Sequence, residues 1–160
     1  MKLLHLDSSI LAGNSASRQL SAAIVDPLAK TQDNTKYLPF VGRALIGGIF
    51  VLSGAGKLGA YSGITAAISA AGLPLAPLGF AIAIAVEIGL GFLLLIGYRA
   101  RPVALTLAIW CVVTAVFFHR NFADQNTFIH FLKNLMIAGG LLQIVHFGAG
   151  ALSVDNRRSA

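Results

Sequence analysis

The stretch that decides the fold runs from Phe128 to Phe147 and reads FIHFLKNLMIAGGLLQIVHF. The stretch is about as long as the roughly 20 residues that an apolar α-helix needs to cross a bilayer. Its first half nevertheless carries His130, Lys133 and Asn134, which stand at i, i+3 and i+4 and therefore share one helix face. Because a charged side chain is costly in hydrocarbon, such residues usually face a bundle interior and mark a functional site. The stretch predicts a membrane-spanning helix with one polar stripe.

The composition of the whole chain agrees with a membrane protein. Of the 160 residues, 56% are hydrophobic and 11% are charged, and the mean hydropathy is +0.77. Soluble domains carry about 25% charged residues. The net charge of +6 does not indicate nucleic-acid binding, because the basic residues are scattered at the ends of apolar runs. Cys111 is the single cysteine, so no disulfide can form within the chain, and its apolar neighbours predict a small buried side chain.

Four apolar segments follow one another from Leu38 onward, and each approaches the length of a spanning helix. They cover residues 38–57, about 75–98, 102–118 and 128–147. Their short connections predict an all-α, up-down-up-down four-helix bundle in a lipid bilayer. We therefore expect three parts: an N-terminal segment 1–36 outside the membrane, a membrane domain 37–148 and a tail 149–160.

The positions of lysine and arginine predict the orientation of the bundle. Most of them fall on one side of the spans, at Lys30, Lys36, Arg43, Arg99, Arg101, Arg157 and Arg158. Because basic residues accumulate in cytoplasmic loops, we expect both termini to be cytoplasmic. The connection at residues 59–74 then lies on the outer side, where it forms either a short helix that covers a cavity or a plain linker.

In the first predicted span, Arg43, Gly47, Phe50, Gly54 and Lys57 repeat at alternating steps of four and three. This spacing places them along one face of a helix. Glycines in a spanning helix permit close contact between helices. The face therefore predicts a packing surface that carries a charge at each end.

Glu87 is the only acidic residue inside a predicted span. At 1.5 Å per residue, it lies roughly 15 Å below the outer surface and Lys133 lies roughly 8 Å below it. An unpaired charge at such a depth would neutralise or cost several kcal/mol, so we expect Glu87 to pair with Lys133 or with Lys57. The pair has two interpretations: a structural ion pair that sets the helix register, or part of a ligand or proton site.

The polar residues of the spans map to the outer half of the bundle, whereas the inner half beyond Arg43 is almost purely apolar. The predicted ligand cluster comprises Lys57, Glu87, His119, His130, Lys133 and Asn134. Each of these residues alone is compatible with a solvated or structural role. His119 and His130 are eleven residues apart, which is no helical metal motif, so no metal site is predicted.

Residues 1–25, MKLLHLDSSI–LAGNSASRQLSAAIV, resemble the opening strand and phosphate loop of the flavodoxin-like FMN-dependent NADH:quinone oxidoreductases, also called azoreductases. The resemblance implies that Ser9, Ser15 and Ser17 stand where that family holds the flavin phosphate at a helix N-terminus. It stops near Val25, and the βα units that would complete a flavin site do not follow. We therefore expect a gene-fusion remnant that is not an independent domain, and no FMN binding by this chain.

The spans resemble the DoxX family of small four-helix bacterial membrane proteins over residues 38–147. The motifs are R-x(3)-G-x(2)-F-x(2)-SG-x(2)-KL at residues 43–58, E-x-G-x(5)-L-x-G-x-R at 87–99, His119 after the third span, and LKNLMIAGGLL at 132–142. Membership implies an inner-membrane location. It also implies a link to thiosulfate–quinone oxidoreduction and to quinone or oxidative stress.

Three functions are open on these grounds. The working hypothesis is an accessory membrane subunit that binds a quinone or similar small redox molecule, with Glu87 exchanging a proton and Lys133, His130 and His119 donating hydrogen bonds. The sequence shows no electron carrier, so we expect a redox enzyme as partner and no activity of the chain alone. The alternatives are a scaffold for membrane redox enzymes and a small proton-coupled transporter. The transporter would have to form a homo-oligomer, because four helices show no inverted repeat.

Overall fold

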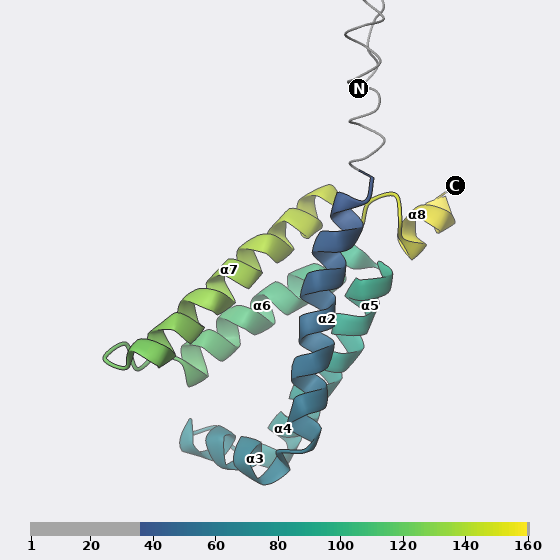
Figure 1. Ribbon diagram of the computed structural model, residues 1–160. Coiled ribbons are helices and arrows are strands. Elements are labelled where there is room, and N and C mark those ends of the chain that lie inside the picture. The colour runs from purple at the N-terminus through teal and green to yellow at the C-terminus, as the bar shows by residue number, and fades with distance from the viewer. Residues whose placement is uncertain (1–35, 160) are drawn as a thin grey trace, which may run out of the picture. The chain divides into compact units, whose positions relative to one another are not determined.

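The computed structural model describes residues 36–159, which are built from helices joined by short connections (Figure 1). In chain order the helices are α2 (Leu38–Leu58), α3 (Tyr61–Ala70), α4 (Ala76–Ile84), the π-helix η1 (Ala85–Leu90), α5 (Gly91–Ile96), α6 (Ala100–Phe118), α7 (Gln125–Phe147) and α8 (Val154–Ser159). No strand occurs in this part of the chain, and the predicted all-α class is confirmed. The predictions for Lys30 and for Ser9, Ser15 and Ser17 lie outside the described residues.

Four continuous helical stretches are long and apolar enough to cross a membrane, as predicted: Leu38–Leu58, Ala76–Ile96, Ala100–Phe118 and Gln125–Phe147. The last two begin earlier than the apolar pattern suggests, because an aspartate caps each start. The side chain of Asp124 accepts a hydrogen bond from the backbone N–H of Thr127 at 2.7 Å, and Asp155 accepts from the N–H groups of Arg99 and Ala100 at 2.7 and 2.8 Å. Such caps satisfy N–H groups that have no partner within the helix.

The helices pack as two close pairs, α2 with η1–α5 and α6 with α7 (Figure 1). A Cβ atom added at Gly47 would lie only 2.8 Å from the carbonyl oxygen of Gly91, so the two backbones almost touch. The predicted face of α2 is confirmed, since Arg43, Gly47, Phe50 and Gly54 are its buried residues. The core of the domain includes Cys111, which is buried as predicted, together with Leu94, Leu107 and Leu141.

Arg43 is a structural residue of the interior. Only 1% of its surface is exposed, although the sequence pattern counted it among the orientation signals. Its guanidinium donates hydrogen bonds to the carbonyl oxygens of Leu95 at 3.3 Å, Leu152 at 2.8 Å and Ala149. Carbonyl groups at and beyond the end of a helix lack helical partners and carry the negative end of the helix dipole. Arg43 therefore ties the start of α2 to the end of α5 and to the chain after α7.

Candidate functional site

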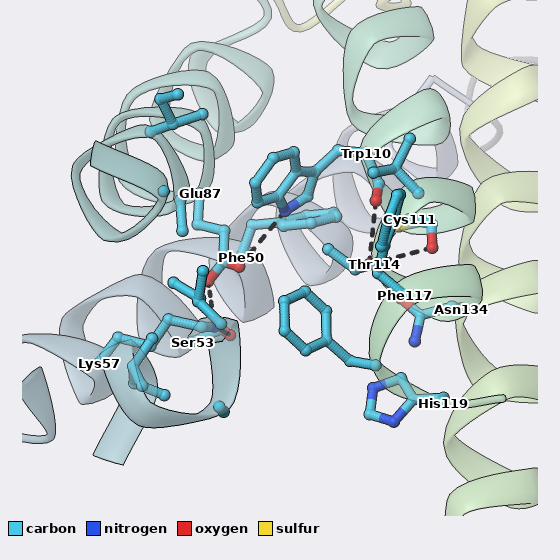
Figure 2. A pocket seen from close by; sticks show the side chains of 18 of the residues that line it. Phe50, Ser53, Lys57, Glu87, Trp110, Cys111, Thr114, Phe117, His119 and Asn134 are labelled. Carbon is cyan, nitrogen blue, oxygen red and sulfur yellow. Dashed lines mark hydrogen bonds and ion pairs between the residues drawn. The ribbon is translucent and has the colours of Figure 1, made fainter. Parts of the chain in front are cut away.

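A cavity of about 710 Å³ lies among α2, α3, α4–η1, α6 and α7 (Figure 2). Most of its wall is apolar, and the polar side chains that line it are Ser53, Lys57, Glu87, Trp110, Thr114, His119 and Asn134. The connection between the first two spans contributes Ile64, Ala67 and Ile68 of α3, so it forms the covering helix rather than a plain linker. An apolar cavity of this size with a few convergent polar groups is typical of a small-molecule site.

Glu87 enters the cavity from the π-helical turn η1, which interrupts the second span. A π turn holds one residue more than an α turn, so it shifts the direction of the side chains that follow, and such turns are frequent at functional sites. Glu87 is only 6% exposed. A Cβ atom at Gly54 would lie 3.1 Å from the Cβ atom of Glu87, so the missing side chain at Gly54 lets α2 pass directly beside this acid.

Lys57 is the partner of Glu87. Its Nζ atom lies 2.6 Å from Oε2 of Glu87 and 2.8 Å from Oγ of Ser53. The indole Nε1 of Trp110 donates a longer hydrogen bond of 3.4 Å to the other carboxylate oxygen, and Figure 2 shows the three side chains converging from α2, η1 and α6. Of the two partners expected for Glu87, the structure has Lys57. The side chain of Lys57 is 25% exposed and that of Glu87 is 7% exposed, so the pair is accessible mainly from the lysine side.

The opposite wall of the cavity is held by contacts between α6 and α7. The hydroxyl group of Thr114 contacts Oδ1 of Asn134 at 3.3 Å, and Nδ2 of Asn134 donates to the carbonyl oxygen of His130 at 2.9 Å. The rings of His119 and His130 stack with their centroids 5.2 Å apart. Burial, and to a smaller extent the charge of His130, lower the pKa of His119 below its ordinary value. His119 is therefore expected to present a neutral imidazole to the cavity at neutral pH.

Of the predicted cluster, Lys57, Glu87, His119 and Asn134 line the cavity, and His130 lies against His119. Lys133 does not belong to this arrangement, because its side chain is exposed on the outer surface of α7 and does not line the cavity. Consecutive residues on a helix are rotated by about 100°. Asn134 points inward, so its neighbour Lys133 turns away.

Trp110 was missed by the sequence reasoning, although a signal for it exists. It is the only tryptophan of the chain and lies in the middle of a span. A buried indole N–H usually finds an acceptor, and Glu87 is the only acid within the predicted spans. These two facts make Glu87 a candidate acceptor for the indole, although they do not show that the two helices bring the side chains together.

Comparison with known proteins agrees with this architecture. Residues 38–120 match the DoxX family model. The chain belongs to the DoxX family. Inner membrane protein YqjF of Escherichia coli (strain K12) is 37% identical to this DoxX protein over 117 residues, which cover 72% of this chain and 87% of the relative. Inner membrane protein YphA of the same strain is 30% identical over 125 residues, or 75% and 89% of the two chains. No solved structure matches the chain.

A third relative matches only a short stretch of this DoxX protein. An FMN-dependent NADH:quinone oxidoreductase of Chromobacterium violaceum is 58% identical over 36 residues, which cover 22% of this chain and 18% of that enzyme. Both predicted resemblances are therefore confirmed, the second as a short partial match. The chain is a DoxX-family inner-membrane protein with an oxidoreductase-like fragment.

Proposed function

We propose that this DoxX protein is an accessory membrane subunit that binds a quinone or a similar small redox molecule in the cavity beside Glu87. The observation that carries the proposal is a nearly buried acid on a π-helical turn, facing a largely apolar cavity of about 710 Å³ inside a membrane domain. Intramembrane acids are costly and usually functional. The cavity volume falls in the range of about 300–1,000 Å³ that is common for small-molecule sites.

The polar groups of the cavity suit a ligand with carbonyl oxygens on an apolar ring. Lys57 and Trp110 are hydrogen-bond donors that already converge on Glu87, at 2.6 and 3.4 Å, and His119 offers an imidazole from the end of α6. A bound quinone would supply a two-electron, two-proton acceptor. The chain's own residues would bind its oxygens, exclude water from its ring and pass one of its protons through Glu87, which Lys57 holds in place by their short contact.

The electrons in this proposal come from a partner enzyme. The sequence and the described residues provide no electron carrier, and no group of three or more potential metal ligands occurs between residues 36 and 159. The short match to an NADH:quinone oxidoreductase supports a redox enzyme as the partner. The arginines at the start of α6 and in α8 support an orientation with both termini in the cytoplasm.

A scaffold function is the second candidate, and one observation favours it. No buried side-chain nitrogen or oxygen among the described residues lacks a hydrogen-bond partner, so the polar cluster is satisfied without a ligand. In that case the Lys57–Glu87 pair would only set the register between α2 and η1.

Tryptophan fluorescence separates the two functions, because Trp110 is the only tryptophan and lines the cavity. We would titrate the full chain in lipid nanodiscs with a short-tailed ubiquinone analogue, whose ring quenches indole emission. Saturable quenching is expected. Glu87→Gln and Lys57→Met should each weaken binding roughly ten- to hundredfold, since a hydrogen bond to a charged group contributes about 1.5–3 kcal/mol.

Lys133→Met is the matched control, because it removes a lysine that is exposed outside the cavity, and it should leave binding unchanged. A Glu87→Gln/Lys57→Met double variant avoids leaving one charge unpaired if a single variant unfolds. Quenching that rises linearly with membrane quinone, without saturation, would reject the quinone site. If folded Glu87→Gln protein still retains partner enzymes, that result would favour the scaffold.

A further inference from the structure

A second groove lies where α6 begins and α7 ends, apart from the Glu87 cavity. Its polar wall carries the side chains of Arg99 and Arg101, and both are exposed. Neither guanidinium makes a hydrogen bond or ion pair with another residue of the described part of the chain. Asp155, which also lines the groove, directs its carboxylate oxygens to the backbone N–H groups of Arg99 and Ala100. The groove therefore presents two positive side chains whose donors are available.

Two further arginines beside the groove add positive charge, and one of them packs against an aromatic ring. Arg157 and Arg158 follow in α8, and the guanidinium of Arg158 lies 4.9 Å from the ring centre of Tyr98. A Cβ atom at Gly148, where φ is +84°, would lie 3.5 Å from Nε of Arg101. This distance is an ordinary van der Waals contact, so the Arg101 guanidinium lies directly beside the end of α7.

The groove joins this charge to an apolar rim. Phe147, the last residue of α7, lines it and is 73% exposed, and Pro102 lines the side of α6. Both residues lie at ends of membrane spans, where the headgroups of the bilayer are found. A guanidinium can bind two phosphate oxygens at once, and an acyl chain would lie along the exposed phenylalanine. We propose that this groove binds the phosphate headgroup of an anionic phospholipid.

The test measures lipid retention by the full chain. Protein in detergent would be titrated with phosphatidylglycerol and, separately, with phosphatidylcholine, and bound lipid would be counted by native mass spectrometry. Phosphatidylglycerol should bind in preference. Each arginine near an anionic surface contributes about fivefold in affinity, so the Arg99→Gln/Arg101→Gln variant should lose roughly 25-fold for this lipid. The fold should survive, because Asp155 caps α6 through backbone N–H groups rather than through these side chains.

Arg120→Gln is the matched control. It removes one positive charge, as each of the two groove substitutions does, from an exposed position in the connection between α6 and α7, and retention of phosphatidylglycerol should be unchanged. Equal binding of the two lipids, or an equal loss in Arg120→Gln, would overturn the proposal. Displacement of bound phosphatidylglycerol by millimolar inorganic phosphate would also overturn it, because the site would then recognise free phosphate rather than a lipid headgroup.

Discussion

Replacing Gly47 by alanine should push α2 away from the second span. The added Cβ atom would lie 2.8 Å from the carbonyl oxygen of Gly91 and 3.0 Å from the backbone nitrogen of Leu95. These are backbone atoms, which cannot turn aside as a flexible side chain could. Ordinary contact begins at 3.4 Å, so the two helices have to separate by about 0.6 Å.

The expected cost follows from two opposing effects. Overpacking costs about 1–3 kcal/mol, whereas alanine is favoured over glycine in a helix by about 1 kcal/mol. Gly47→Ala should therefore lower the free energy of unfolding by up to about 2 kcal/mol. The next residue provides a matched control, because a Cβ atom at Gly48 meets nothing within 4 Å. Gly48→Ala should raise stability by up to about 1 kcal/mol.

Reversible unfolding of the purified chain in mixed micelles, followed by the fluorescence of its only tryptophan, measures both variants. The two should differ by about 1–3 kcal/mol, which is the overpacking cost alone, because both variants gain the same helix propensity. Equal stabilities, or a Gly47→Ala protein more stable than Gly48→Ala, would refute the close approach of α2 to α5. Gly47→Ala should also weaken quinone binding, because α2 carries Lys57 toward Glu87.

Two further predictions concern the ends of the helices. Arg43→Met should lower the free energy of unfolding by about 3 kcal/mol or more, because it leaves buried carbonyl groups without donors. Arg43→Lys should not restore this stability, since an ammonium group cannot reproduce the planar arrangement of three hydrogen bonds. Wild-type stability in the lysine variant would contradict this role. For His119, whose folded-state pKa is lowered by burial, the unfolded chain takes up a proton at its ordinary pKa of 6.5 while the folded chain stays neutral to lower pH. Stability should therefore fall as the pH drops below about 6.5, and His119→Gln should reduce that fall in a comparison of unfolding at pH 7.5 and 5.5.

The choice of partner for Glu87 shows where sequence reasoning stops. Counting the rise along each helix estimates the depth of Glu87, Lys57 and Lys133 but not the rotation of each helix about its axis. The π turn makes this harder, because its additional residue shifts the direction of Glu87 without leaving a mark in the hydrophobic pattern. Lys133 and Asn134 are consecutive residues, so the rotation of about 100° between them is enough to place Asn134 at the cavity and Lys133 on the side of α7 that faces away from it.

The sequence also does not distinguish the buried arginine from the exposed ones. Arg43, Arg99 and Arg101 look alike in the sequence, since each stands near the end of an apolar run. In the structure, Arg43 is enclosed by carbonyl groups from α5 and from the chain after α7, whereas Arg99 and Arg101 stay exposed on a groove. The difference depends on segments more than 50 residues away along the chain.

The sequence by itself determined the four spans, the buried face of α2, the burial of Cys111 and the DoxX resemblance. These features depend on local requirements, because the thickness of the bilayer sets the length of an apolar helix and the helical repeat sets which residues share a face. Only the tertiary structure decided that Lys57 pairs with Glu87, that Trp110 joins them, and that Lys133 lies outside. These contacts depend on how closely two helices approach and how each is rotated. Between α2 and the second span, glycines at the contact let the two backbones approach closely, and the sequence pattern of one helix does not contain the rotation of its neighbour.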